Sequence, residues 1–320
     1  MTTQRTVPWS FGVPLALLVG VAFWALWPVL TSMADRWSTD PRYAHGYLVP
    51  LFSLALVWLR RDAFLESTFR PTTWGLAFLA AGAGVQLLGG YYRIQSIEGG
   101  ALLFYLAGAV LVVAGWPAFR WSWPSILFLV FMIPLPTRIE TALGPPLQRL
   151  ATMASTYTLQ TLGFMAFSEG NVIQLNDYSI GVVEACSGLS MLITFVALST
   201  GMALLIKRPL LDKLVLIASS IPVALVANIA RITLTGILHE TVGGNVANHF
   251  YHDLAGWLMI PFALVLYWCV IWMFSNILVE VEQVPLLVGV RVAPPSLGDE
   301  IPKQKGSRPG AHATRPRRVR

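Results

Sequence analysis

Cys186 is the strongest candidate nucleophile in this chain of 320 residues. It lies just before a long apolar segment, where a helix is expected to begin, and the dipole and free N–H groups of a helix start favour a thiolate. Ser187 and Gly188 would leave that position open to the backbone of another chain. Alternatively, Cys186 is a small apolar filler at a helix start. Cys269 lies within an apolar segment, where packing explains it.

Arg231 is the second candidate, because it interrupts the apolar segment 228–232 (NIARI). A cation within a membrane helix is costly and marks a functional site by default. Asn228 is one helical turn earlier on the same face and could hold the guanidinium in place. The alternative is an arginine whose side chain snorkels to the lipid headgroups.

Three of the five histidines, His239, His249 and His252, surround one predicted loop. We expect His252, at the start of the last apolar segment, to be an acid–base group. Zinc binding is the alternative, but His239 lacks the second histidine of the zinc-protease motif, and His249 with His252 would need further ligands. We therefore predict neither a metal nor a cofactor. His45 is expected to contact substrate or a catalytic group, or else to cap a helix.

A nucleophilic cysteine, a proton carrier and a cation that can stabilise an oxyanion are the parts that acyl transfer requires. The composition shows which kind of element must position them. Hydrophobic residues make up 55% of the chain and charged residues 12%, whereas soluble domains carry roughly 25% charged residues. This excludes an ordinary cytosolic enzyme and indicates an all-α polytopic membrane protein.

About eight transmembrane helices are expected, since a spanning helix needs about 20 mainly apolar residues. Their predicted ranges are 11–33, 43–59, 74–90, 99–119, 121–135, 187–206, 214–237 and 254–278. Most of the 22 basic residues fall on one side if both termini are cytoplasmic, which the positive-inside rule favours. Cys186, Arg231 and His252 then share the outer, periplasmic face of the cytoplasmic (inner) membrane.

Two segments do not fit membrane helices. Residues 137–167 are amphipathic and predict a helix on the outer surface, and the residues around Asn176-Asp177 predict a small hairpin before the sixth span. The tail is rich in proline, glycine and basic residues, which is typical of disorder and of contact with anionic lipid. Two regions follow: a transmembrane domain, 1–282, and a cytoplasmic tail, 283–320. The positive charge lies in the tail and loops, so we expect no nucleic-acid partner.

The sequence resembles the exosortase/archaeosortase family of multi-spanning membrane transpeptidases. The motifs that carry the resemblance are 184–189 (EACSGL), 228–232 (NIARI), 252–256 (HDLAG), and 44–50 (AHGYLVP) followed by Arg60-Arg61. Their order and their placement on successive helix ends make the joint signal strong. The resemblance covers roughly residues 34–278.

The resemblance implies that Cys186 is the nucleophile, Arg231 its basic partner and His252 the general acid/base. His45, Asn228 and Glu184 would contact the substrate or support these groups. Family members are expected to cleave a C-terminal sorting signal of exported proteins, which combines a motif such as Pro-Glu-Pro, a transmembrane helix and a basic end. The product passes through a thioester to an acceptor. The alternative function is a non-catalytic membrane component of polysaccharide or protein export, in which the three residues are structural.

Overall fold

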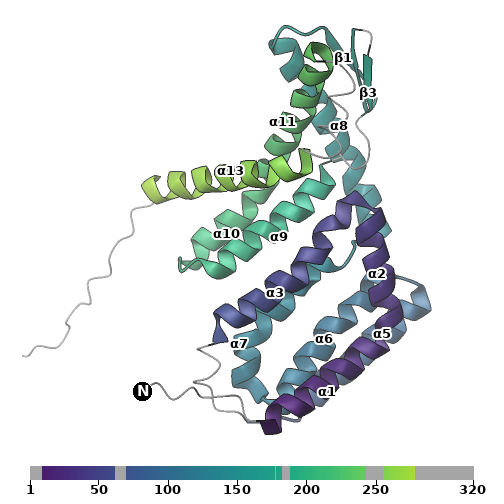
Figure 1. Ribbon diagram of the computed structural model, residues 1–320, viewed down its shortest axis with the longest axis vertical. Coiled ribbons are helices and arrows are strands. Elements are labelled where there is room, and N and C mark those ends of the chain that lie inside the picture. Colours follow the sequence, from purple (N-terminus) through teal and green to yellow (C-terminus); the bar gives the residue numbers. More distant parts are fainter. Residues whose placement is uncertain (1–8, 62–69, 177, 182–187, 243–254, 278–320) are drawn as a thin grey trace, which may run out of the picture. The chain divides into compact units, whose positions relative to one another are not determined.

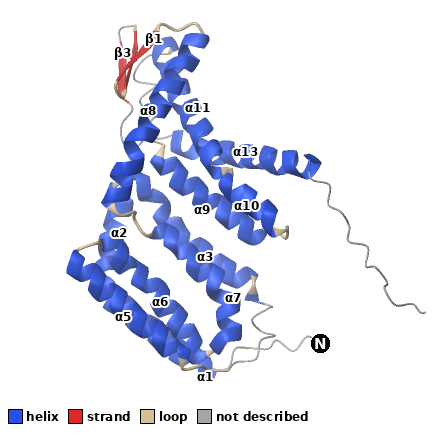
Figure 2. Cartoon of the chain, turned by 180° about the vertical axis from the view of Figure 1, so that it is seen from behind, coloured by secondary structure: helices blue, strands red, loops and turns tan. Residues whose placement is uncertain are grey.

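The computed structural model describes residues 9–61, 70–176, 178–181, 188–242 and 255–277. These residues form helices and one small sheet (Figures 1 and 2). The elements of the first part are α1 (Trp9–Ala25), α2 (Trp27–Thr39), the 3-10 helix η1 (Pro41–Tyr47), α3 (Leu48–Leu59), α5 (Trp74–Tyr92), α6 (Gln95–Val113), α7 (Gly115–Phe128) and the 3-10 helix η2 (Leu129–Met132).

The second part begins with a long helix and the sheet, and ends with four helices. These elements are α8 (Thr137–Thr161), β1 (Ala166–Glu169), β2 (Val172–Leu175), β3 (Tyr178–Gly181), α9 (Leu189–Leu205), α10 (Leu210–Ala218), α11 (Ser220–Thr241) and α13 (Ala255–Ile277). The predicted tail, 283–320, lies outside the described residues.

Three helices of the described ranges are long and apolar enough to cross a membrane: 74–92, 95–113, and 210–241 taken as one unit. Two bent pairs raise the number to five if each is one span, namely α1 with α2, bent by 69°, and 115–132 with α8, bent by 71°. The expected count of eight spans is not confirmed. One reason is length: α3 has 12 residues and α9 has 17, fewer than the about 20 of a typical span.

The span expected at 99–119 is divided into two helices. α6 ends at Val113, and α7 begins at Gly115, whose φ is +80°. A Cβ at Gly115 would lie 1.7 Å from the carbonyl oxygen of Arg70, so only glycine fits this turn. Apolar residues on both sides conceal the break from a hydropathy pattern.

α8 accounts for the predicted amphipathic segment, but it ends at Thr161. It packs against α11, with Thr152 and Ser155 fully buried and the Ser155 hydroxyl 3.5 Å from the carbonyl oxygen of Ile229. The sheet that follows has three antiparallel strands in the order β1-β2-β3. β2 and β3 pair on either side of residues 176–177, and β1 adds a strand that the predicted two-stranded hairpin lacks.

Two apolar clusters hold the second part together. One joins the sheet to α8 and α11 through Leu159, Ile173, Ile180 and Ile232. The other joins α9, α10, α11 and α13, and its members include Phe195, Leu216, Ala227 and Tyr267. α11 belongs to both clusters, so the helix that carries Arg231 is packed on several sides.

Candidate active site

α11 carries two of the predicted site residues on one face. Asn228 is fully buried, and Arg231 is half-buried one turn later. Pro222 lies in the first turn of the helix, where proline does not interrupt the hydrogen-bond ladder. Asn228 and Arg231 lie three residues apart on the continuous helix α11.

The start of α9 lies against Asn228. Gly188 precedes α9 in a left-handed conformation with a φ of +81°. A Cβ there would be 3.3 Å from Nδ2 of Asn228 and 3.9 Å from Cβ of Leu147 on α8. Glycine therefore serves both the backbone conformation and the close approach to α11.

Cys186 and Glu184 lie outside the described residues, but both described flanks of their segment are next to α11. On one side, β3 ends at Gly181, and Ile180 packs in the same cluster as Ile232 of α11. On the other side, Gly188 meets Asn228. The polar face of α11 and the two ends of this segment thus belong to one region of the protein.

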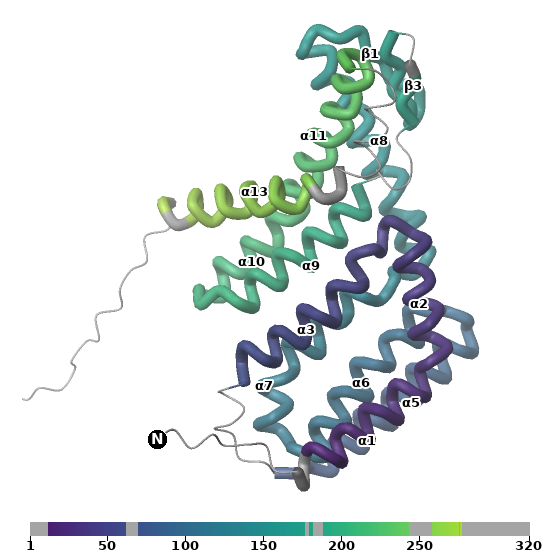
Figure 3. Tube along the Cα trace, in the orientation of Figure 1, coloured from purple at the N-terminus to yellow at the C-terminus, as the bar shows by residue number. Residues whose placement is uncertain are grey.

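α13, the helix that follows the start of the 252–256 motif, also packs against α11. His249 and His252 lie outside the described residues, and α13 begins at Ala255. Met259, in its second turn, shares an apolar cluster with Ala227, the residue before Asn228. α9, α11 and α13 meet in this cluster, which the chain trace allows the reader to follow (Figure 3).

His45 lies in η1 and joins three elements. Its Nε2 is 3.2 Å from the carbonyl oxygen of Phe131, and its Nδ1 is 3.3 Å from Oγ1 of Thr194 on α9. Since a carbonyl only accepts, Nε2 carries the proton. Burial lowers the pKa of His45, so the ring is neutral at physiological pH. Thr194 is six residues after Gly188, about 9 Å along α9, and these contacts make His45 a link between η1 and α9.

The structure contains a buried ion-pair network that the sequence pattern did not predict. Glu140, in the first turn of α8, is 7% exposed. Its carboxylate lies 2.9 Å from Nη2 of Arg36 and 3.5 Å from Nη1 of Arg42, and it accepts a hydrogen bond from the hydroxyl of Tyr43. The available signal was an acidic residue at the start of an amphipathic segment, together with Arg36 near the end of α2 and Arg42 in η1.

The network extends to the backbone and to a second carboxylate. The Tyr43 oxygen accepts from the Leu135 N–H at 3.1 Å, and burial together with the Glu140 hydrogen bond raises the pKa of Tyr43. Arg42 also makes a two-pronged pair with Asp40. Burial opposes ionisation of Asp40, but the hydrogen bonds and charge of Arg42 outweigh it and lower the pKa.

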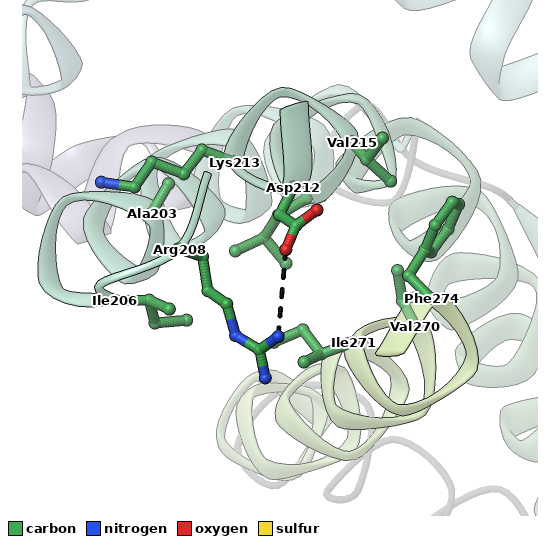
Figure 4. A pocket seen from close by; sticks show the side chains of 10 residues that line it. Ala203, Ile206, Arg208, Asp212, Lys213, Val215, Val270, Ile271 and Phe274 are labelled. Carbon is green, nitrogen blue, oxygen red and sulfur yellow. Dashed lines mark ion pairs between the residues drawn. The ribbon is translucent and has the colours of Figure 1, made fainter. Parts of the chain in front are cut away.

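Within the described ranges, no group of three or more His, Cys, Asp or Glu residues lies close enough to bind an ion. His249 and His252, the histidines of the zinc alternative, lie outside these ranges. Cys269 is exposed on α13, so the packing role expected for it is not seen. A small pocket between α9, α10 and α13 contains the Arg208–Asp212 pair at 4.0 Å and Lys213 (Figure 4). Of the predicted catalytic residues, only Arg231 lies within the described ranges, and it does not line that pocket.

The apolar helices of the described ranges agree with a comparison to known families. The family model for transmembrane exosortases matches residues 37–269, a range that includes all four motifs. The chain belongs to the transmembrane exosortase family. Neither the curated proteins nor the solved structures contain a match to it.

Gly188→Ala tests the approach of α9 to α11. We expect the free energy of unfolding to fall by about 1–2 kcal/mol, because alanine is strained in the left-handed region and its Cβ would crowd Asn228. Gly163→Ala is the matched control, since Gly163 also has a positive φ of +92° and nothing lies within 4 Å of its added Cβ. In a double-mutant cycle in detergent, Asn228→Ala should relieve part of the loss. Strict additivity would contradict the contact.

The buried His45 predicts a dependence of stability on pH. Because its folded-state pKa is below the ordinary value of 6.5, the unfolded state binds the proton more tightly. The stabilisation is present above pH 6.5 and is lost as the pH falls toward the folded-state pKa, by at most about 1.4 kcal/mol per pH unit. Between about pH 7.5 and about pH 5.5, the melting temperature of His45→Gln should depend less on pH than that of the wild-type protein. An identical dependence in both proteins would argue against a buried neutral ring.

Proposed function

We propose that this exosortase is a membrane cysteine peptidase and transpeptidase that uses Cys186 as its nucleophile, Arg231 as its oxyanion-stabilising cation and His252 as its general acid/base. The observation that carries the proposal is the approach of Gly188 to Asn228. Cys186 is two residues before Gly188, and Arg231 is one turn after Asn228. Family membership supports the reaction class.

The reaction begins with transfer of the Cys186 thiol proton to His252. The thiolate attacks a substrate carbonyl, and Arg231 stabilises the negative charge on its oxygen, as donors of an oxyanion hole do. The C–N bond then breaks, His252 protonates the leaving amine, and the acyl group stays on Cys186 as a thioester. An acceptor amine, or water, attacks the thioester and restores the thiol.

Asn228 is proposed to hold the reacting groups in position. Its side chain is fully buried and close to Gly188 at the start of α9, one turn before Arg231 on α11. A buried amide with close neighbours has little rotational freedom, which favours a fixed position for the groups it contacts. Glu184 and His45 are the further residues expected near the substrate, with His45 acting through its link between η1 and α9.

The proposed substrates are exported proteins with a C-terminal sorting signal made of a Pro-Glu-Pro-like motif, a transmembrane helix and a basic end. Such a signal would place its motif at the membrane surface while its helix remains in the bilayer. The proposed location is the cytoplasmic membrane, with the active site at the periplasmic face and both termini in the cytoplasm. Membrane lipid and an acceptor molecule are the other partners.

Cys186→Ala is expected to abolish processing of a reporter that carries the sorting signal. A small side chain at a helix end contributes little to stability, so the variant should still fold. His252→Ala should lower the rate of thioester formation by about 10²–10⁴-fold, whereas His239→Ala should be mild. The measurement is the amount of shortened reporter in membranes, together with capture of a reporter thioester on wild-type enzyme.

Two outcomes would overturn this assignment. Wild-type processing by Cys186→Ala would favour the non-catalytic export component. Inhibition by chelators, with His239→Ala and His249→Ala as inactive as His252→Ala, would favour a metalloenzyme. Melting curves of each variant separate lost chemistry from lost folding.

Arg231→Lys is expected to process the reporter at a rate reduced by at least about tenfold. Lysine keeps the charge but not the planar set of donors that can be aimed at an oxyanion. If Arg231 only snorkels to headgroups, lysine should serve as well, and processing would stay near the wild-type rate. Arg93→Lys, an exposed arginine in a loop, is the control substitution.

A further inference from the structure

β3 is an edge strand, and the chain leads from it to the proposed nucleophile. The strand order β1-β2-β3 leaves one side of β3 without a neighbouring strand among the described residues. Cys186 is five residues after Gly181, the last residue of β3, and five residues of chain span at most about 18 Å. One short extended peptide can therefore reach from this edge to the proposed nucleophile.

The register between β2 and β3 determines which backbone groups face the free edge. In an antiparallel ladder, successive residues direct their N–H and C=O groups alternately to one side and to the other. Leu175 and Tyr178 flank a two-residue connection and are therefore a hydrogen-bonded pair. By alternation, Ile180 also bonds to β2. The N–H and C=O groups of Ser179 and Gly181 point to the opposite side, which is the free edge of the sheet.

The opposite edge of the sheet, along β1, obeys the same rule but is partly covered. Glu169 pairs with Val172 across the other two-residue connection. Alternation from this pair turns the backbone groups of Ser168 and Ala166 outward. The outward carbonyl oxygen of Ala166 accepts a hydrogen bond from Nε2 of Gln160 on α8 at 2.7 Å. No such bond from a described residue reaches the free edge of β3.

The free edge of β3 is open to an incoming chain. Ser179 and Gly181 are both exposed, and no atom of the described residues lies within 4 Å of a Cβ added to Gly181. Natural edge strands usually carry a proline, a lysine or a bulge that prevents further pairing. β3 has the sequence YSIG and pairs with β2 in a continuous register, so it carries none of these.

The rest of the strand is held in place by α11, the helix that carries Arg231. The Ile180 side chain is buried in the cluster that contains Ile232 of α11. The Asn176 side chain, just before β3, donates a hydrogen bond to the carboxylate of Glu240, near the end of α11. An edge fixed in this way is preorganised, which lowers the entropic cost of binding.

We propose that the free edge of β3 binds the substrate segment next to the cleaved bond as an added β-strand. This inference rests on the proposed peptidase function. A carbonyl inside a helix is engaged in a hydrogen bond, so a segment that is attacked must be extended. Main-chain bonds to Ser179 and Gly181 supply that conformation and its register, as in other cases of strand addition.

Proline substitutions on the two edges test this contact. Ser179→Pro and Gly181→Pro each remove an outward N–H and leave the hydrogen bonds to β2 in place. With full-length protein in detergent and a synthetic peptide that carries the sorting signal, each should raise KM at least about fivefold through the lost hydrogen bond and the ring on the edge, with kcat unchanged. Ser168→Pro, the matched change on the β1 edge, should keep the wild-type KM. Melting curves show which variants fold.

A scan of the peptide tests the same contact without changing the strand. Each peptide carries one N-methyl group on a single backbone nitrogen next to the cleaved bond. Its Kd is measured with Cys186→Ala protein, which lacks the proposed nucleophile. The Kd should rise at least about fivefold at every second residue, because only alternate N–H groups of an added strand face β3. Recognition by side chains alone would give no such alternation.

The outcomes separate this inference from the proposed function. If the wild type processes the peptide, an unchanged KM in both edge variants, an equal loss in Ser168→Pro or a scan without alternation would overturn strand addition and leave the peptidase in place. If the wild type does not process a peptide that Cys186→Ala binds with the alternating pattern, the peptidase function fails and β3 remains a peptide-binding edge. Absence of both processing and binding would overturn both.

Discussion

The arrangement of the described helices depends on the ion pairs and the hydrogen bond of the Glu140 carboxylate. It joins α2 through Arg36, η1 through Arg42 and Tyr43, and α8 through its own backbone. Loss of one partner from a buried ion pair leaves an uncompensated charge and typically costs about 3–5 kcal/mol. The pair therefore holds the first turn of α8 against η1, and α8 in turn packs on the helix that carries Arg231.

Small and polar residues allow the helices around Arg231 to approach one another. Ser155 of α8 is fully buried, with its hydroxyl 3.5 Å from the carbonyl oxygen of Ile229 on α11, and Gly236 of α11 lies against Leu159, where a Cβ would be 3.1 Å away. In lipid, close packing and hydrogen bonds replace the hydrophobic effect as the force between helices. A closely packed α11 gives a polar residue such as Arg231 a defined surrounding, which a catalytic role would require.

The hydropathy pattern predicted apolar helices in the correct parts of the chain but failed at their ends and bends. α1 and α2 form one apolar segment in the sequence but are bent by 69° in the structure. The turn at Gly115, where φ is +80°, divides another such segment, and only glycine fits there because the carbonyl of Arg70 occupies the position of a side chain. A hydropathy pattern records how apolar a segment is and not the backbone angle at a single residue.

The sequence by itself determined the class of protein and the residues worth testing. Composition defines a membrane protein, and the short motifs around Cys186, Arg231 and His252 define the family, because both are properties of local sequence. Only the tertiary structure decided that Gly188 meets Asn228, that His45 joins Phe131 to Thr194, and that Glu140 is buried between two arginines. The partners in these contacts are 40 or more residues apart, and no local pattern specifies which distant residues meet when helices pack.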